Sequence, residues 1–364
     1  MKKVLVLAVP LVILAAGGLG WWWWRPPPPI PVGMVAWLAS GAVVGSSEIN
    51  AGDLFLEERP RSRIQVVPLD DEWKPERSAP VIQGAMAQGV RFFISTHPSN
   101  CAVACLHLFA DPGALLLNLA STSPILSNKD DYFLRIIPDG VREQQAIARY
   151  INQLPGQRLL VLQDTGNRPY TDPAFVAFSA ELAALGGTWQ IEHRPLRVAD
   201  FKPDDYRALM AEPYDALYIL AGSFQTAVGN LAQLFHYQHP EAPILLTPWA
   251  RSPAILETAG AAIDRIILPS PYPSRRQEPA LDDYLQRFQA RFGYEAHVMT
   301  VGVRQALELL DAAFAQGYET PEAVKAYLLS VPVHQTSLGP IAFDRGGDVG
   351  GHFYFLTDLE RELR

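Results

Sequence analysis

The sequence predicts an α/β protein with two parallel sheets, each covered by helices on both faces. Short apolar runs alternate with amphipathic runs from Ile30 onward, which is the pattern of repeated β-α-β units. The alternation forms two series, and turn-rich stretches at 138–140 and 269–273 mark their boundaries. At 364 residues the chain is also longer than a single hydrophobic core usually is, so two domains are expected.

The first series is expected to run from residue 30 to residue 117. Pro75 marks a helix start, because the first turn of a helix has no use for the missing N–H of proline. Ser46 and Ser47 can cap another helix. The expected strands are Ile30–Ala36, Arg63–Leu69, Val90–Ser95 and Ala114–Leu117, and the expected helices are Ser46–Glu58, Lys74–Gln88 and Asn100–Ala110.

The second series alternates strands and helices in the same way, and the C-terminal third of the chain is more helical. The expected strands are Leu159–Leu162, Thr188–His193, Ala216–Leu220, Ile244–Leu246 and Ile263–Leu268, and the expected helices are Pro173–Leu185, Pro203–Met210 and Phe224–Tyr237. Apolar residues between Val303 and Phe314 recur at helical spacing, and Gly317 ends that helix. A further helix at Pro321–Ser330 precedes closing strands at Ile341–Phe343 and His352–Leu356.

Residues 1–29 have the pattern of a signal peptide or of an N-terminal membrane anchor. Lys2 and Lys3 precede an uncharged apolar run, and four tryptophans and four prolines follow it. Small residues near the end of the run suit cleavage. The 21 residues of Val4–Trp24 would instead form a helix of about 30 Å, enough to span a bilayer. The lack of an Ala-x-Ala site before the tryptophans favours the anchor, and both alternatives place the body outside the cytoplasm.

Composition and motifs argue against several classes of function. The chain has 30 Lys and Arg against 38 Asp and Glu, a net charge of −8 without a basic block, so we expect no nucleic-acid partner. The sequence contains no dinucleotide fingerprint, no P-loop and no Gly-x-Ser-x-Gly motif, and we find no paired acid and base. We therefore expect no cofactor and no enzymatic activity.

One spacing resembles a metal site. His97, Cys101 and Cys105 are four residues apart and would share one face of a helix. A zinc site needs further ligands, and none is evident nearby. Cysteine is also among the residue types most often buried, so packing explains these two residues better and we expect no metal.

Two segments carry a resemblance to a known family. Ile94–Asn100 has a polar loop with Ser99 after a strand, and Leu115–Pro124 has a turn of small residues with Ala120 and Thr122 after the next strand. This order resembles the type I periplasmic solute-binding proteins, of the branched-chain amino-acid-binding kind. The further matches, in order, are Asp70-Asp71, Leu134-Arg135, Gln163-Asp164 with Tyr170, and Ser337–Asp344 with Gly347-Asp348. The likeness spans about residues 30 to 357.

The resemblance implies two Rossmann-like lobes joined by three hinge crossings, with a ligand cleft between them. Lobe 1 would comprise residues 30–136 and 270–335, and lobe 2 residues 137–269 and 336–364. The hinges would lie near 136–142, 268–273 and 335–340. Open parallel sheets bind ligands beyond the carboxyl ends of their strands, which agrees with a cleft there.

The resemblance also assigns site residues. Ser99 and Thr122 would donate their hydroxyl protons to a ligand carboxylate, and the carbonyl of Ala120 would accept from a ligand ammonium. Tyr170 would close over the ligand from the second lobe. Local structure offers alternatives, since Ser99 could cap a helix, Thr122 could be a turn residue and Tyr170 a surface aromatic.

The sequence departs from the family at one position. Amino-acid-binding members place an acidic residue after the strand that here ends Leu246-Thr247-Pro248, and this chain has Trp249. A desolvated ammonium without a countercharge is unfavourable, so we expect a small carboxylate or another compact organic solute, and an amino acid stays open. Trp249 could offer a cation–π face to a ligand, or could contact an apolar or aromatic ligand body. Trp37 could add a second flat wall, or could pack within its lobe.

The resemblance implies a receptor rather than an enzyme. The expected protein is periplasmic, captures a small organic solute and delivers it to an ABC-type permease. The alternative is a membrane-tethered sensing domain, held by residues 4–24 and acting through a signalling partner. Retention of the N-terminal segment in the mature protein would favour the tethered form.

Overall fold

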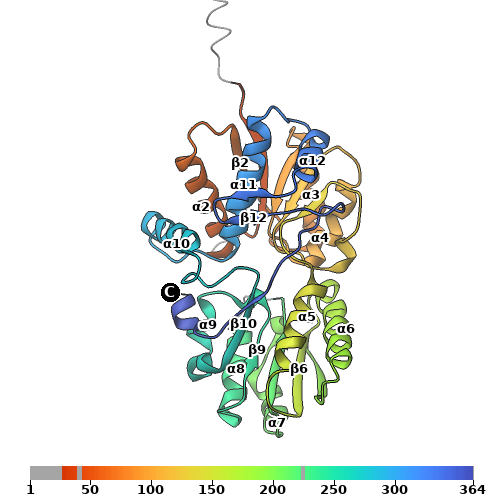
Figure 1. The fold of residues 1–364 in the computed structure, drawn as a ribbon, viewed down its shortest axis with the longest axis vertical. Coiled ribbons are helices and arrows are strands. Elements are labelled where there is room, and N and C mark those ends of the chain that lie inside the picture. The colour runs from red at the N-terminus through yellow and green to blue at the C-terminus, as the bar shows by residue number, and fades with distance from the viewer. Residues whose placement is uncertain (1–26, 39–42, 223–225, 364) are drawn as a thin grey trace, which may run out of the picture.

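The computed structural model describes residues 27–38, 43–222 and 226–363. Two α/β lobes lie one above the other, and the chain passes between them three times (Figure 1). This architecture confirms the predicted fold class. The expected signal peptide or anchor falls mainly on residues 1–26, outside the described residues.

In the described part of the chain, the first sheet has five parallel strands in the order β2-β1-β3-β4-β5. Every residue of β3, β4 and β5 is buried, which explains why these strands read as unbroken apolar runs. The strands are β1 (Ile30–Ala36), β2 (Ile64–Asp70), β3 (Phe92–Ser95), β4 (Leu115–Asn118) and β5 (Phe133–Arg135).

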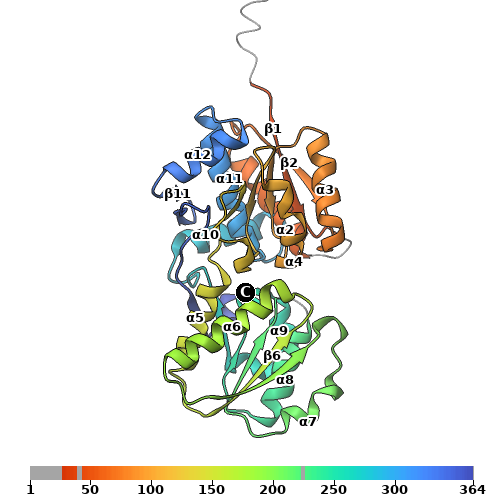
Figure 2. The same ribbon diagram turned by 90° about the vertical axis from the view of Figure 1, so that its right-hand side faces the viewer.

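Helices cover both faces of this sheet, because alternate side chains of its strands point to opposite sides. Ile94 belongs to a core shared with α11, whereas its neighbour Phe93 packs in a second core with α3 and α4. Figure 2 shows α3 and α11 on opposite sides of the strands. The helices are α2 (Val43–Glu58), α3 (Pro75–Ala87), α4 (Ser99–Cys105), α10 (Pro279–Phe292), α11 (Met299–Ala315) and α12 (Pro321–Ser330).

The second sheet repeats this winding in the order β13-β10-β9-β8-β6-β7, parallel except for β13, which runs antiparallel to β10. Its strands are β6 (Arg158–Asp164), β7 (Gln190–Leu196), β8 (Ala216–Leu220), β9 (Ile244–Leu245), β10 (Ile266–Ser270) and β13 (Tyr354–Leu356). Its helices are α5 (Gly140–Ile151), α6 (Arg168–Ala184), α7 (Arg207–Met210), α8 (Thr226–Gln238), α9 (Ala254–Thr258) and α13 (Leu359–Glu362).

Some elements differ from those expected. The helix predicted to start at Pro173 begins five residues earlier, at Arg168, and holds Pro173 inside it. The stretch expected as a helix at 203–210 divides into a short 3-10 turn at Pro203–Asp205 and α7. Helix α10 was not predicted. Its local signals were overlooked, since Pro279 stands in its first turn and Gly293, in the left-handed conformation, follows its last residue.

The third crossing lies later in the chain than expected. Ile341 and Val349 are buried in the core of the first lobe, and a two-stranded ladder of β11 (His334–Thr336) and β12 (Gly339–Ile341) precedes them. Only the strand β13 and the helix after it join the second sheet. Residues 336–349 therefore pack with lobe 1, whereas the expected division gives 336–364 to lobe 2.

A buried arginine fixes this arrangement. Arg135 is fully buried, and its Nε donates to Asp348 Oδ1 at 2.7 Å. One terminal nitrogen donates to the carbonyl of Ser123 at 3.0 Å, and the other donates to the hydroxyl of Ser127. The backbone N–H of Arg135 donates to the carbonyl of Gly347. Arg135 thus ties β5 both to the loop after β4 and to the turn before the third crossing.

Within residues 27–38, 43–222 and 226–363, no helix has the length and apolar composition needed to cross a membrane.

We expect Arg135→Met to lower the free energy of unfolding by about 3 kcal/mol or more, because it leaves Asp348 buried without its countercharge. Urea denaturation followed by circular dichroism measures the change. The control is Arg197→Met, since Arg197 and its ion-pair partner Asp200 are both exposed. Its expected loss is below about 1 kcal/mol. Equal effects of the two variants would contradict the role given to Arg135.

Candidate ligand-binding site

A cavity lies between the two lobes, and residues from both line it. Its empty space is about 320 Å³, including the part open to solvent, at the lower end of the range for small-molecule sites. Five of the six predicted site residues are in its lining. The lining residues are Trp73, Thr96, Pro98, Ser99, Ala120, Thr122, Asn167, Tyr170, Gly222, Trp249 and Met299.

The sheet topology places these residues together. Most of them follow the carboxyl ends of strands: β2, β3 and β4 in one sheet, and β6, β8 and β9 in the other. In both sheets the winding reverses beside the first strand of the series, between β1 and β3 and between β6 and β8. Loops diverge at such switch points and leave room for a ligand.

Two buried hydroxyls form the polar side of the cavity. Thr122 is 1% exposed, and its Oγ1 has no hydrogen-bond partner among the described residues. Ser99 is 2% exposed, and its Oγ accepts from the backbone N–H of Ser123 at 3.2 Å, which leaves its own proton to donate. Because a buried polar group without a partner is unfavourable, this side of the cavity suits a hydrogen-bond acceptor from a ligand.

The backbone around Thr122 is closely held. Its carbonyl accepts from the N–H of Gly140 at 2.7 Å, and a Cβ at Gly140 would lie 2.9 Å from that oxygen. The N–H of Ala120 donates to Asn118 Oδ1 at 3.2 Å. The loop is therefore fixed before any ligand arrives.

The second lobe contributes an aromatic wall. Tyr170 and Trp249 are buried and meet edge to face, with ring centroids 6.5 Å apart. The Tyr170 hydroxyl donates to Glu143 Oε1 at 2.5 Å. Tyr170 lies in α6, so it is not the surface loop aromatic of the alternative interpretation.

A chain of buried polar side chains lies behind Tyr170, and no sequence pattern predicted it. Gln144 Nε2 donates to Glu143 Oε1, and the hydroxyl of Tyr218 donates to Gln144 Oε1, both at 2.8 Å. Burial raises the pKa of Glu143 to about 7 and raises the pKa of Tyr170. A Glu-Gln pair at a helix start normally suggests a solvated surface, whereas here both residues face inward.

Trp37 is not among the lining residues. It lies at the rim, 37% exposed, with its ring centroid 5.7 Å from that of Trp73. Trp73 itself lines the cavity and was missed in the sequence. The structure thus places Trp73, and not Trp37, among the lining residues of the cavity.

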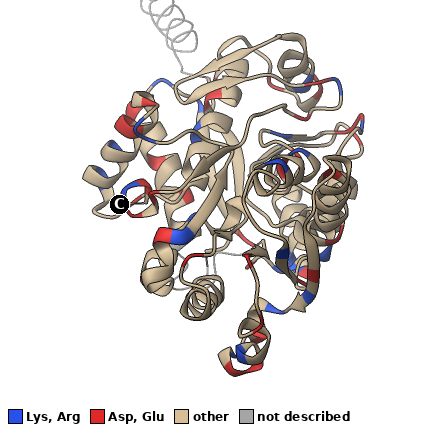
Figure 3. Cartoon of the chain, turned by 60° about the horizontal axis from the view of Figure 1, so that its bottom comes forward, with Lys and Arg blue, Asp and Glu red and all other residues tan. Residues whose placement is uncertain are grey.

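Of the described residues that line the cavity, none carries a formal charge. The segments 39–42 and 223–225 also contain no acidic or basic residue in the sequence. Glu48 lies behind Thr96, whose hydroxyl donates to it at 2.8 Å, and burial raises the pKa of Glu48 to about 8. Charged residues instead lie interspersed over the outer elements, as in Figure 3.

The lobes touch directly beside the cavity. The N–H of Asn100 in α4 donates to Asn167 Oδ1, at the start of α6, over 3.3 Å. Figure 2 shows α4 above α6 at this junction. The cavity is thus bounded by a hydrogen bond between lobes.

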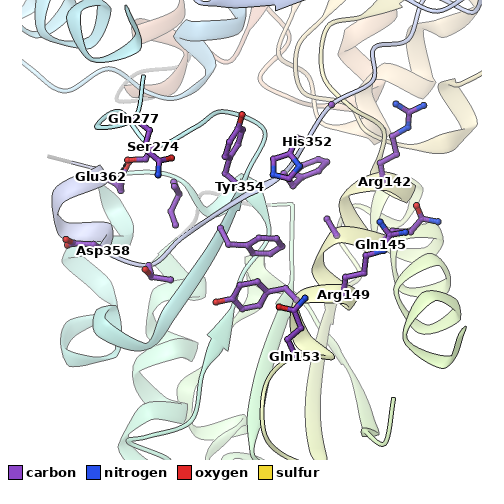
Figure 4. A pocket seen from close by; sticks show the side chains of 17 residues that line it. Arg142, Gln145, Arg149, Gln153, Ser274, Gln277, His352, Tyr354, Asp358 and Glu362 are labelled. Carbon is purple, nitrogen blue, oxygen red and sulfur yellow. Dashed lines mark hydrogen bonds between the residues drawn. The ribbon is translucent and has the colours of Figure 1, made fainter. Parts of the chain in front are cut away.

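A larger hollow lies on the hinge side, with about 1540 Å³ of empty space that includes open solvent. Helix α5 and the turn after it form one side of it, with Arg149 and Gln153, and the third crossing forms the other, with His352 and Tyr354 (Figure 4). Few of its residues follow the carboxyl ends of parallel strands. We therefore take the smaller cavity between the lobes as the candidate site.

The spacing that resembled a metal site has another structural explanation. Cys101 and Cys105 are buried in α4 with free thiols. His97 precedes that helix, and its Nε2 lies 3.3 Å from Asp71 Oδ2. Within the described ranges, no group of three or more His, Cys, Asp or Glu is arranged to hold a metal ion.

The raised pKa of Glu143 predicts a pH dependence of stability. The folded protein keeps this proton up to about pH 7, whereas the unfolded chain loses it near 4.5, so the group's contribution is present below pH 4.5 and lost as pH rises through 7. We expect Glu143→Gln to reduce the fall in unfolding free energy between pH 4.5 and 8 by about 3 kcal/mol.

Urea titrations at pH 4.5, 6 and 8 measure this difference. The control is Glu257→Gln, which changes an exposed carboxylate. The same pH profile for Glu143→Gln and the unchanged protein would show that Glu143 ionises normally when folded.

Comparison with known proteins agrees with this geometry. The sequence model of the family described as periplasmic binding protein matches residues 31–362. The Leu/Ile/Val-binding protein BraC3 of Rhizobium johnstonii is 23% identical over 336 residues, which cover 88% of this chain and 86% of the relative.

Two crystal structures have the same fold. The leucine-binding protein LivK of Thermotoga maritima has a TM-score of 0.79 at 18% identity, over 90% of this chain and 94% of that one. A solute-binding protein of an ABC transporter from Rhodopseudomonas palustris, in complex with 3,4-dihydroxybenzoic acid, has a TM-score of 0.78 at 17% identity, over 90% and 92%. The family match spans most of the chain, and the chain therefore belongs to the periplasmic binding protein family, as its resemblance to the branched-chain amino-acid-binding members predicted.

Proposed function

We propose that this chain is an exported receptor that holds a small monocarboxylate without an ammonium group in the cavity between its lobes. The observation that carries the proposal is the buried, unpartnered hydroxyl of Thr122 beside Ser99, in a lining whose described residues carry no formal charge. The bound acid would be delivered to an ABC-type permease.

The hydroxyls of Ser99 and Thr122 would donate to the carboxylate. Hydrogen bonds to an ionised acceptor are stronger than those between neutral groups, so two such donors can offset part of the desolvation of the acid. The body of the ligand would lie against Tyr170, Trp249 and Trp73, which present apolar faces.

An α-amino acid suits this cavity less well. Its ammonium would need a countercharge, and two acidic groups, Glu48 and Glu143, lie behind the lining residues Thr96 and Tyr170. Burial raises the pKa of each, so both favour the neutral form that cannot pair with a cation. The dihydroxybenzoate held by the Rhodopseudomonas palustris protein is an acid without an ammonium, which supports the same choice here.

We further propose that residues 30–136 and 270–349 move as one lobe and 137–269 and 354–364 as the other. Prolines or glycines stand at each passage, such as Pro138, Pro271 and Gly350. Residues 1–29 would export the chain to the periplasm, where residues 4–24 would also tether it if they are retained. Closure around a bound solute is the expected working motion.

Calorimetric titration with benzoate, pentanoate, leucine and isoleucine tests the ligand class. We expect at least one of the two acids to bind at least tenfold more tightly than either amino acid, because only the amino acids bury an unpaired ammonium. Tight binding of leucine with no binding of either acid would overturn the proposal.

The role of the hydroxyl is tested by Thr122→Val, which keeps the shape of the side chain. We expect the Kd of the acid to rise about tenfold or more, since a hydrogen bond to a charged group contributes about 1.5–3 kcal/mol. Thr188→Val is the matched control, because Thr188 is exposed and absent from the lining. Unchanged affinity in Thr122→Val would show that the acid is held elsewhere.

A further inference from the structure

The turn that presents Trp73 has an unusual backbone. Glu72 and Trp73 have φ angles of 54° and 52°, so two consecutive residues other than glycine adopt the left-handed conformation. Side chains with a Cβ disfavour this region, and it is normally visited by single residues. Glycine or asparagine would adopt this turn more easily. The presence of glutamate and tryptophan therefore indicates that a requirement other than the turn itself selects these residues.

Two aspartates hold the turn in place. Asp70 Oδ1 accepts from the N–H groups of Glu72, at 2.9 Å, and of Leu38, at 3.1 Å. Asp71 Oδ1 accepts from the N–H of Trp73 at 3.0 Å, and its Oδ2 accepts from the hydroxyl of Ser78 at 2.6 Å. Two of these four donors are backbone N–H groups of the turn itself. The other two, on Leu38 and Ser78, connect the turn to the rest of the lobe.

The anchor reaches into the protein interior. Asp71 and Ser78 are completely buried, and Asp71 also lies 3.3 Å from His97 Nε2. A buried carboxylate with these partners resists displacement, since its removal would leave several polar groups unpaired. Strain that the surroundings maintain in this way is typical of ligand clamps.

The result of this turn is the position of Trp73 in the cavity. Its indole lines the site from the first lobe, opposite the aromatic wall of Tyr170 and Trp249 from the second. Trp37 packs on Trp73 from the rim, at an angle of 43° between the rings, and limits where the indole can turn. The ligand body thus has flat surfaces on both lobes.

We propose that Trp73 is a specificity-determining residue that selects a planar aromatic ring as the body of the bound acid, and that Asp71 is the residue that positions it. This inference rests on the proposed function of the cavity. Aromatic rings stack on an indole with an attraction beyond their area burial, whereas a saturated ring of similar size is thicker and has no π face. Packing of the lobe alone would not require a left-handed turn at the same point.

The experiment compares benzoate with cyclohexanecarboxylate, two acids of similar size, by calorimetric titration. The unchanged protein is expected to prefer benzoate about tenfold or more. Trp73→Leu should remove most of this preference by weakening benzoate about tenfold and cyclohexanecarboxylate less than threefold. Trp73→Phe is the conservative substitution, because it keeps a flat aromatic ring, and it should retain part of the preference for benzoate.

Asp71→Asn tests the positioning role, because the amide keeps the acceptor oxygen for the N–H of Trp73. It should preserve the preference, whereas Asp71→Ala should reduce it toward that of Trp73→Leu. Tyr237→Leu is the control, because Tyr237 is an exposed aromatic residue outside the cavity lining, and it should leave the affinities for both acids unchanged.

The outcomes separate the two proposals. If both acids bind and Trp73→Leu and Trp73→Phe weaken them equally, the inference about Trp73 is wrong while the proposed function stands. If the unchanged protein binds neither of these acids and does not bind pentanoate, the proposed function fails and the inference fails with it. Binding of pentanoate alone would contradict the inference and leave the proposed function standing. A benzoate preference that falls in the order unchanged, Phe, Leu supports the inference, even if Trp73→Leu alone proves too unstable to titrate.

Discussion

The candidate site depends on the completely buried guanidinium group of Arg135. Arg135 joins Asp348 to the carbonyls of the loop after β4, and that loop contains Thr122. Such a charge is stable in the interior only when its partners surround it, so the loop, the strand and the turn before the third crossing must assemble together. The passage between the lobes and the polar side of the cavity are therefore fixed by the same contact.

The aromatic side of the cavity follows a similar principle. Tyr170 is held through its hydroxyl by Glu143, and Trp73 through its backbone by Asp71. Each buried carboxyl lies behind the ring it orients, outside the lining. Rings alone pack in many orientations, whereas a buried hydrogen bond selects one, because any other orientation leaves a polar group without a partner. The two carboxyl groups therefore influence which ligand shape fits the cavity, without adding a charge to its lining.

These anchors mark the limit of what the sequence could predict. The strands Ile30–Ala36 and Ala216–Leu220 and the helix Pro321–Ser330 were predicted with their observed bounds, since apolar patterns and proline positions are local signals. Ser99 and Thr122 could be placed because parallel strands bring their following loops to one edge. Glu143, Trp73 and the late third crossing were missed. Glu143 and the third crossing depend on contacts between residues far apart in the sequence, such as Arg135 with Asp348. The position of Trp73 depends on a left-handed turn that its residue types do not predict.

In the proposed function, a ligand carboxylate would bring the one formal charge into a lining that has none of its own. Taking that charge out of water is unfavourable unless donors already stand in place. The hydroxyls of Ser99 and Thr122 would decide whether an acid is held, and the aromatic walls would decide which acid. These two properties rest on different anchors, Arg135 for the Thr122 loop and Asp71 with Glu143 for the rings. A related chain could therefore have different aromatic residues in these walls, and bind a different acid, while the two hydroxyls still bind the carboxylate.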